Sequence, residues 1–208
     1  MDYILIGDSG HAKVIEDSIV ANGDRVIAKL DDKYKEHFME GAYKKGPISI
    51  LSSIYQPPIK LIVAIGNNEI RQKIVRQLNL PSEYYGKVIH PSAIISPSVT
   101  IGNGSVIMAN VVINAQATIG EHVIINTSTV VEHDNTIDNY VHLSPGTVST
   151  GNVHISEGVH IGAKCVIIPS IHIQRWTTIG AGSTVTKDIE EHVVAFGTPA
   201  KVMRKKDV

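Results

Sequence analysis

Histidine is the side chain best suited to proton transfer at neutral pH, and the sequence contains ten histidines and a single cysteine. One of the ten, His133, is followed directly by Asp134. A carboxylate beside an imidazole fixes the tautomer of the ring and raises its basicity, as it does in hydrolase triads. The pair therefore predicts a general base that takes a proton from an attacking nucleophile.

The surroundings of His133 depend on a repeat that fills the second half of the chain. From Ile89 to Glu190 the chain reads as 17 hexads over 102 residues, and 16 of the 17 leading residues are aliphatic. Neither a helical period nor strict alternation gives a six-residue repeat. A parallel β-helix does, because three hexads form one coil and the leading residues stack inward on the coil below.

Residues 18 positions apart are then neighbours in successive coils. The neighbours of His133 are Ala115 and Gly151, and both are small enough to leave room for a substrate. The two clearest departures from the hexad pattern are close by: Asn135 stands at a small-residue position, and Ser149 stands at a leading position. Such departures are typical of functional or strained sites. The alternative for His133 is an ordinary histidine in a surface turn.

Residues 1–85 have a different pattern, typical of a small parallel α/β sheet. Apolar runs predict strands over 3–7, 25–30 and 61–65, and apolar residues at helical spacing predict a helix over 12–21 and another after residue 68. The turns at 7–11, 31–33 and 66–68 all follow strands, at the edge where open parallel sheets bind ligands. Each turn alone is compatible with an ordinary loop, but together they indicate a nucleotide-like site.

The first of these turns contains Gly7 and Gly10 but lacks the G-x-G-x-x-G pattern of dinucleotide-binding folds. Backbone N–H groups at the start of the following helix suit a phosphate or a carboxylate. Asp31 lies where such folds place an acid against a ribose hydroxyl. We therefore divide the chain into an α/β domain over 1–85, a β-helix over 86–190 and a C-terminal tail over 191–208.

The hexads resemble the hexapeptide acyltransferase family, and the front domain narrows this resemblance. Residues 10–14 (GHAKV), the acidic pair Asp31-Asp32 and residues 64–71 (AIGNNEIR) are similar to the branch that contains bacterial UDP-4-amino-sugar N-acetyltransferases and sialic acid O-acetyltransferases. Residues 197–201 (GTPAK) resemble the exit of the family from its β-helix. The resemblance implies a Rossmann-like front domain, a left-handed parallel β-helix, a homotrimer and acetyl-CoA as co-substrate.

The same resemblance implies roles for residues of the β-helix. His133 matches the general base, Asp134 its carboxylate partner, and Asn126 a residue near the acceptor. Asp134 stands where the branch commonly has Glu. His142 matches a contact to acetyl-CoA, and the backbone positions that match the thioester and the CoA arm are Gly151, Ala163 and Ala181.

In the front domain, the resemblance implies that a UDP-sugar binds at the carboxyl ends of the strands. Asp8 departs from the small residue usual in the first turn, which predicts that its charge repels a phosphate. The residues that match contacts to the nucleotide-sugar are Ser9, Gly10 and His11; those that match the uridine are Asp31 and Asp32; and Gly66 matches the uracil side of the pocket.

The activity that follows is acetylation of the 4-amino group of a UDP-linked 4-amino-6-deoxy sugar in bacterial glycan or exopolysaccharide biosynthesis. The amine attacks the thioester directly, without a covalent acyl-enzyme. Two alternatives remain at this point. One is O-acetylation of sialic acid or another sugar by the same machinery, and the other is a sugar-nucleotide sensor or scaffold without catalysis.

The remaining histidines and the cysteine favour structural roles. Two pairs, His142 with His160 and His154 with His172, are 18 residues apart and should stack at an outward-facing position. Two histidines without an acid make a weak metal site, and no two histidines have the H-x4-H spacing of the carbonic anhydrases built on this helix, so no metal is expected. Cys165 stands at an inward small-residue position and is expected in the core.

Composition limits the remaining possibilities. Hydrophobic residues make up 43% and charged residues 19% of the 208 positions, which is typical of a globular chain. The net charge of −1 does not favour a nucleic-acid partner. The first residues lack the basic and apolar regions of a signal peptide, and no apolar run approaches the roughly 20 residues that span a membrane. We therefore expect a cytoplasmic protein.

Overall fold

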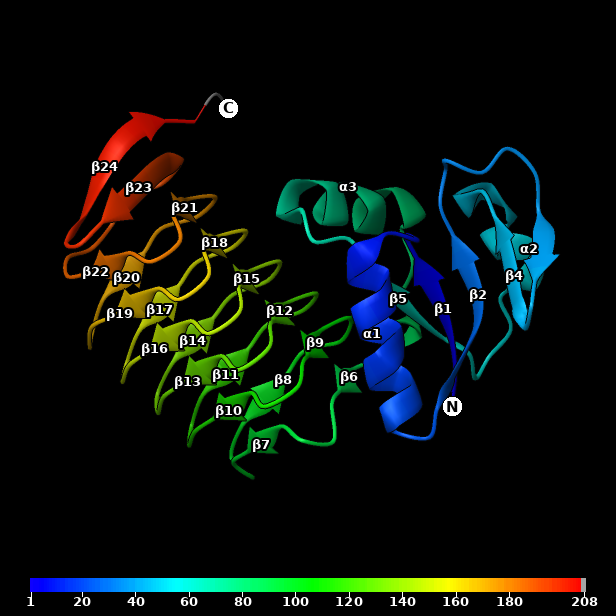
Figure 1. Ribbon diagram of the computed structural model, residues 1–208, viewed down its shortest axis with the longest axis horizontal. Coiled ribbons are helices and arrows are strands. Elements are labelled where there is room, and N and C mark those ends of the chain that lie inside the picture. Colours follow the sequence, from blue (N-terminus) through cyan, green and yellow to red (C-terminus); the bar gives the residue numbers. More distant parts are fainter. Residues whose placement is uncertain (207–208) are drawn as a thin grey trace.

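The computed structural model describes residues 1–206, with an α/β domain at one end and a prism of stacked coils at the other (Figure 1). The α/β domain is built on a five-stranded sheet of order β3-β4-β2-β1-β5, in which only β3 is antiparallel to its neighbour. Its strands are β1 (Asp2–Ile6), β2 (Arg25–Leu30), β3 (Phe38–Glu40), β4 (Tyr43–Gly46) and β5 (Lys60–Val63), and its helices are α1 (Gly10–Ala21), α2 (Leu51–Ile54) and α3 (Asn68–Leu78).

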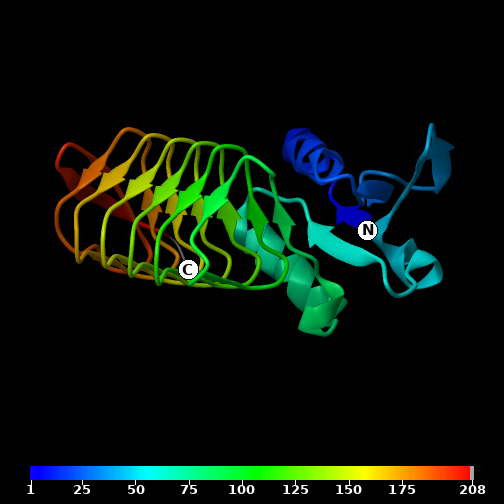
Figure 2. The same ribbon diagram turned by 90° about the horizontal axis from the view of Figure 1, so that it is seen from below.

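The prism is a left-handed parallel β-helix with three faces, each a parallel sheet, and Figure 2 shows its coils stacked in a row. Every leading residue of the hexads, from Ile89 to Val185, is the second residue of a two-residue strand. The first face contains β6 (Val88–Ile89), β9 (Val106–Ile107), β12 (Ile124–Ile125), β15 (His142–Leu143), β18 (His160–Ile161) and β21 (Thr178–Ile179). The second contains β7 (Ile94–Ile95), β10 (Val112–Ile113), β13 (Val130–Val131), β16 (Val148–Ser149), β19 (Val166–Ile167) and β22 (Thr184–Val185). The third contains β8 (Thr100–Ile101), β11 (Thr118–Ile119), β14 (Thr136–Ile137), β17 (His154–Ile155) and β20 (His172–Ile173).

The strand register confirms the 18-residue coil. Val112 pairs with Val130, and Val130 pairs with Val148, without a register shift. From Ile107 to Val185 every leading residue is buried, and all of them except Ser149 belong to one apolar core cluster. Burial of this cluster supplies the driving force that short two-residue strands lack on their own.

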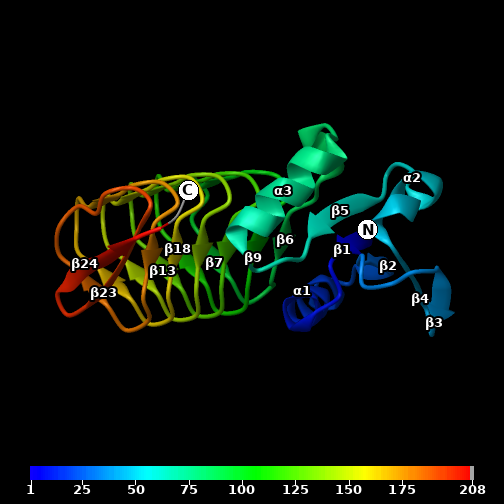
Figure 3. The ribbon, with the colours of Figure 1, turned by 90° about the horizontal axis from the view of Figure 1, so that it is seen from above.

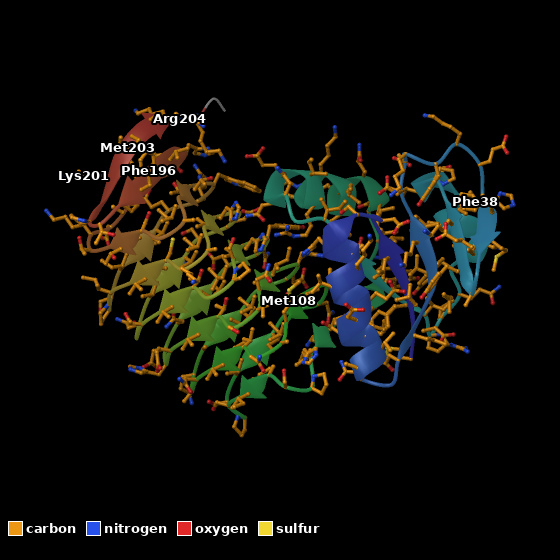
Figure 4. All side chains as sticks on the ribbon, viewed as in Figure 1. Phe38, Met108, Phe196, Lys201, Met203 and Arg204 are labelled. Atoms are coloured by element: carbon orange, nitrogen blue, oxygen red, sulfur yellow. The ribbon has the colours of Figure 1, made fainter. Side chains whose placement is uncertain are left out.

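The prism ends in a hairpin. Strand β23 (Val193–Gly197) continues the first face by pairing in parallel with β21, and β24 (Ala200–Lys205) then folds back antiparallel to β23. Residues 193–197 therefore extend the β-helix into the segment expected to be a tail. Figure 4 shows Phe196, Lys201, Met203 and Arg204 on this hairpin, at the opposite end of the molecule from Phe38.

The two domains share a core, which fixes their relative position. Ala12, Ile15 and Ile19 of α1 are buried in one cluster with residues of the first face, including Val106 and Met108. Figure 3 shows α3 lying across the junction between the α/β sheet and the prism. The front domain thus covers the early coils of the first face and leaves its later coils open.

Candidate active site

The first turn of the α/β domain joins β1 to α1 at the carboxyl edge of the sheet. The Gly7 N–H donates to Leu30 O at 2.6 Å, and the Asp8 N–H donates to Asp31 Oδ2 at 2.9 Å. Gly7 has φ +110°, a conformation that glycine adopts without strain. The structure therefore brings the turns after β1 and β2 together, and the carboxylate of Asp31 is one of the groups that holds them.

Asp8 has a partner of opposite charge. Its Oδ2 lies 2.5 Å from the hydroxyl of Tyr34 and 3.0 Å from Nζ of Lys45. Burial raises the pKa of Asp8, but the hydrogen bonds from Tyr34 and Lys45 outweigh it and hold this pKa below its usual range. Lys45, which also lies 2.7 Å from Glu40 Oε1, therefore offsets part of the negative charge of Asp8. The repulsion of a phosphate by Asp8 stays a prediction.

The start of α1 leaves polar groups free. Ser9 is the N-cap residue and makes no capping hydrogen bond, and the space around Gly10 is open. His11 is half-buried, and its Nε2 has no partner. Burial, helped by the charge of Arg71, lowers the pKa of His11 to about 4, so the ring is neutral at pH 7. This end of α1 is thus able to donate hydrogen bonds to an anionic ligand without a net charge of its own.

Asp32 and Gly66 stand at the neighbouring turns. Asp32 Oδ1 accepts the N–H of Ile48 at 2.9 Å, so this carboxylate also supports a loop. Gly66, after β5, has open space where a Cβ would stand. Its carbonyl oxygen lies 3.2 Å from His142 Nδ1 of the β-helix, which links the front domain directly to the first face.

His142 stands at an outward-facing position of its coil, as expected, but it is buried between the two domains. It points out of its coil, but the front domain covers it, and its ring centre is 6.0 Å from that of His11. Nδ1 donates to the carbonyl of Gly66, so Nε2 is free to accept from Asn126 Nδ2 at 3.2 Å. Burial, with the charge of Arg71 and the nearby ring of His160, lowers the pKa of His142 to about 3.

His133 and Asp134 lie in the turn between the second and third faces. His133 Nδ1 is 2.7 Å from Asp134 Oδ2, and both side chains are exposed. A Cβ built on Gly151, one coil further on, would lie 2.7 Å from Cε1 and Nε2 of His133. The ring therefore lies over Gly151, as the 18-residue spacing predicts.

The predicted site residues fall into two groups within the chain. His142 meets the front domain at the first face and contacts Asn126 there. His133, Asp134 and Gly151 lie at the corner between the second and third faces. Ala163 and Ala181 lie in successive coils at the corner between the first and second faces. There the coils approach so closely that a Cβ on Gly162 would lie 2.4 Å from Ala181 N.

A cavity of about 370 Å³ adjoins His142 on the side away from Asn126. It lies between the start of α3, the open coils of the first face and the end of the chain. Sequence reasoning named Asn68 as part of the turn over 66–68, but it placed neither Glu69 nor Thr178 at a site, because nothing in their spacing signals that α3 lies over this face. The residues that line it are Gly66, Asn67, Asn68, Glu69, His142, Gly158, His160, Thr178 and Lys206.

Both expected histidine stacks are present. The rings of His142 and His160 are 5.0 Å apart, and those of His154 and His172 are 4.5 Å apart. Each of the four rings also lies within hydrogen-bonding distance of a polar side chain 16 positions earlier, for example His154 with Asp138 at 3.1 Å. The stacks thus form cross-coil hydrogen bonds. Among residues 1–206, no group of three or more histidine, cysteine or acidic side chains is arranged to hold a metal ion.

Cys165 is fully buried, and its Sγ donates to Gly180 O at 3.1 Å. Burial raises the pKa of this thiol above its usual value, which disfavours the reactive thiolate. The expectation of a core cysteine is confirmed. Within the described part of the chain, none of the helices has the length and apolar character to cross a membrane.

A left-handed hexapeptide β-helix, joined to a parallel α/β domain and bearing a His–Asp pair at a corner, defines the class of hexapeptide-repeat acyltransferases. Residues 2–78 match the PglD N-terminal domain, and residues 98–133 and 152–187 match the bacterial transferase hexapeptide (six repeats). The chain belongs to the hexapeptide-repeat sugar N-acetyltransferases.

Relatives of known activity support this assignment. A variant of perosamine N-acetyltransferase from Caulobacter crescentus, solved with CoA and GDP-perosamine, is 35% identical with a TM-score of 0.90, covering 99% of this chain and 98% of that one. The acetyltransferase domain of PglB from Neisseria gonorrhoeae, solved with acetyl coenzyme A, is 33% identical with a TM-score of 0.88, covering 97% and 98%. UDP-N-acetylbacillosamine N-acetyltransferase from Bacillus subtilis is 43% identical over 104 residues, which is 49% of this chain and 48% of that protein. The match to this curated relative thus spans about half its length.

Proposed function

We propose that this protein transfers the acetyl group of acetyl-CoA to the 4-amino group of a UDP-linked 4-amino-6-deoxy sugar. The observation that carries the proposal is the exposed His133–Asp134 pair, whose imidazole ring lies over Gly151. A sugar amine is protonated for much of the time at neutral pH and needs a base before it attacks. Cytoplasmic synthesis of bacterial glycan precursors is the setting in which such a reaction belongs.

The reaction needs one base and one hydrogen-bond donor at the carbonyl. His133 Nε2 takes a proton from the sugar ammonium, and the freed lone pair forms a bond to the thioester carbonyl carbon. The C–S bond then breaks, and the second amine proton goes to the departing thiolate. Asp134 holds the proton on His133 Nδ1, and the backbone N–H of Gly151 stabilises the charge on the carbonyl oxygen.

We assign the acceptor to the first face and the front domain. Ser9, Gly10 and His11 supply donors to the diphosphate, Asp31 and Asp32 lie beside the uridine, and Gly66 forms the uracil side. Asn126 and His142 lie where the front domain meets the β-helix, next to the sugar and the acetyl group. The CoA arm follows the backbone at Ala163 and Ala181.

We propose that the active site forms between copies in a homotrimer. In one chain the base and the acceptor pocket lie at different corners, so a second copy is needed to bring His133 to the pocket. The second face supports this packing, because five of its six outward strand positions are aliphatic and form a column, whereas the third face has threonine and histidine at these positions. The column contains Ile94, Val112, Val130, Val148 and Val166.

Thiol release from acetyl-CoA, measured with a colorimetric reagent, tests the proposal. The acceptors are UDP- and GDP-linked 4-amino sugars and free sialic acid, because relatives act on both nucleotide types. Turnover with the UDP-amino sugars, with kcat/KM of at least about 10⁴ M⁻¹s⁻¹, supports it. Turnover only with a GDP-amino sugar would show that the nucleotide of the acceptor is GDP and not UDP. Turnover only with sialic acid would show that the protein is an O-acetyltransferase.

The variant His133→Ala distinguishes an enzyme from a protein that only binds the nucleotide-sugar. The variant should bind both substrates and lose at least about 100-fold in kcat, as expected for a missing general base. His154→Ala is the matched control, because His154 also pairs with an aspartate on the prism surface. If His133→Ala retains the wild-type rate, the mechanism fails. If the wild type binds nucleotide-sugar but never releases thiol, a sensor or scaffold replaces the enzyme.

A further inference from the structure

A buried polar pair lies inside the β-helix directly beneath the turn that bears His133. Ser149 replaces an aliphatic leading residue, and Asn135 replaces a small or β-branched one; their side chains are almost completely buried, with 0% and 1% of the residue surface exposed. Ser149 Oγ donates to Asn135 Oδ1 at 2.6 Å. Both departures from the repeat therefore belong to a single hydrogen-bonded unit.

The amide group of Asn135 binds three backbone carbonyls. Its Nδ2 is 2.9 Å from Glu132 O, 3.2 Å from His133 O and 2.7 Å from Thr150 O. Two of these carbonyls belong to the peptide groups on either side of the His133 Cα. One side chain thus restrains both backbone torsions that set where the imidazole points.

The bond to Thr150 restrains the other side of the site. Thr150 O and the Gly151 N–H belong to the same planar trans peptide, so they point in opposite directions. Since the carbonyl points inward to Asn135, the Gly151 N–H points outward, beneath the ring of His133. This N–H donates to no protein acceptor within residues 1–206. Asn135 therefore links the orientation of the base to that of the amide donor.

Coil stability alone does not require this pair. Elsewhere in the prism, Thr129 and Thr147 make the same bond to a carbonyl 15 positions later with one hydroxyl. Thr147 also reaches a carbonyl three positions earlier. A threonine at position 135 would preserve these coil contacts, and an aliphatic residue at 149 would restore the inner column. Unlike threonine, asparagine also donates a hydrogen bond to His133 O, and its side-chain oxygen accepts one from Ser149.

We propose that Asn135 and Ser149 are positioning residues that hold His133 and the Gly151 N–H in their reactive geometry. This inference rests on the proposed function, in which these two groups act on the amine and the thioester carbonyl. Neither residue touches the substrates. Both act through the backbone of the turns that they bind.

The test is the double variant Asn135→Thr/Ser149→Val, which gives the two positions the residues that the repeat uses elsewhere. Replacing a buried polar pair with well-packed apolar groups leaves stability unchanged or raises it. We expect an unchanged or higher melting temperature, an unchanged KM for acetyl-CoA, and a kcat about 10- to 100-fold lower, since small misplacements of reacting groups have effects of this size. Thr177→Val, which removes a buried hydroxyl far along the prism, should change kcat by less than about twofold.

A second readout does not depend on turnover. In protein labelled with isotopic histidine, the ring resonances of His133 are identified by their loss in His133→Ala. They should report one fixed ring state in the wild type and shift or broaden in the double variant. In the His133→Ala background, the double variant should lower the residual rate by much less than it does in the wild type.

The outcomes separate this inference from the proposed function. An inactive wild type refutes the function, while the ring resonances still test the positioning. A double variant that folds normally, keeps kcat within about twofold and leaves the resonances in place overturns the inference. If the double variant fails to fold, Ser149→Ala serves in its place, because it removes only the donor to Asn135 Oδ1. A fold loss shared by both variants assigns the pair to stability and overturns the inference.

Discussion

At the scale of single residues, Gly151 matters because of the side chain that it lacks. The ring of His133 occupies the space that a Cβ on Gly151 would need. The clash would fall on the exposed end of a flexible side chain, not on backbone. The ring would therefore move, and the fold would not.

Gly151→Ala should thus reduce kcat by about 10- to 100-fold with a change in unfolding free energy of less than about 1 kcal/mol. The measurements are steady-state kinetics and urea unfolding. A double-mutant cycle provides the control, because the substitution should have little further effect once His133 is alanine. Equal losses in both backgrounds would show that Gly151 acts through something other than the ring.

Buried histidines make the junction between the domains sensitive to acid. His122 stacks on Tyr140 with ring centres 5.4 Å apart, and its Nδ1 is buried without a partner. Burial, helped by the charge of Arg71, lowers the pKa of His122 to about 4, and burial lowers that of His142 to about 3. Both rings are therefore neutral in the folded protein well below pH 6.5, while the unfolded chain already binds protons there.

Each of these histidines stabilises the fold fully above about pH 6.5 and loses its contribution as pH falls toward the folded-state pKa. The loss is up to about 1.4 kcal/mol per pH unit for each ring. Urea unfolding at pH 7.5 and pH 5 measures it. His122→Asn should lower stability at pH 7.5 but flatten its decline toward pH 5. Parallel curves for the variant and the wild type would contradict this prediction.

At the scale of elements, Arg71 of α3 is the main polar link between the domains. Its side chain is 1% exposed and faces no carboxylate within hydrogen-bonding distance among the described residues. It donates to the carbonyls of His122 and Tyr140 in two successive coils, and to Ile65 O beside the predicted uracil pocket. The planar guanidinium suits this task, because its five donors diverge in a fixed geometry.

Arg71→Met should lower the unfolding free energy by at least about 3 kcal/mol, because several buried acceptors lose their donor. Where the protein remains folded, the KM for the nucleotide-sugar should rise more than the KM for acetyl-CoA. The unfolding free energy of Arg71→Lys should lie between those of Arg71→Met and the wild type. Arg76→Met on the exposed side of the same helix is the control, with an expected change within about 0.5 kcal/mol. A wild-type stability for Arg71→Met would show that apolar packing alone holds the domains together.

The elements that the sequence predicted are those with a strong period. The hexads predicted the position of every strand from β6 to β22, including β16, whose leading residue Ser149 is polar. The predicted strand over 25–30 coincides with β2. Strands β3 and β4 and the single turn of α2 were not predicted, because they are short and carry no period.

The sequence likewise predicted some features of the candidate site and not others. The neighbours of His133 followed from the 18-residue coil, since stacking is a local rule that the sequence displays. The burial of His142 did not, because it depends on how a separate domain packs on the first face. Asn68 was predicted only as part of the turn over 66–68, and Arg71 only as part of a resemblance. Their contacts with the prism required the three-dimensional arrangement.

At the scale of the whole molecule, the aliphatic column of the second face is the surface to test for self-association. Val148 lies in the middle of this column and is partly exposed. A glutamate there would bury its charge in the proposed contact between copies, which is unfavourable. The substitution Val148→Glu should therefore release monomers and abolish turnover while the chain remains folded.

Light scattering coupled to size-exclusion chromatography measures the mass of both forms. The matched control is Thr118→Glu, which places the same charge on an exposed strand position of the third face. The control should remain a trimer with normal activity. A trimeric and active Val148→Glu would place the contact between copies on a different face.

The terminal hairpin limits the association of one molecule with the end of another. A stack of identical coils has no natural end, since each rung offers the next the same row of backbone groups, and open rungs invite fibre growth. On the first face, β24 reverses direction and carries the exposed side chains of Lys201, Arg204 and Lys205. Like charges on a reversed strand repel a second molecule that would otherwise continue the column. The hairpin thus acts as a terminator that keeps a self-templating architecture at a finite length on this face.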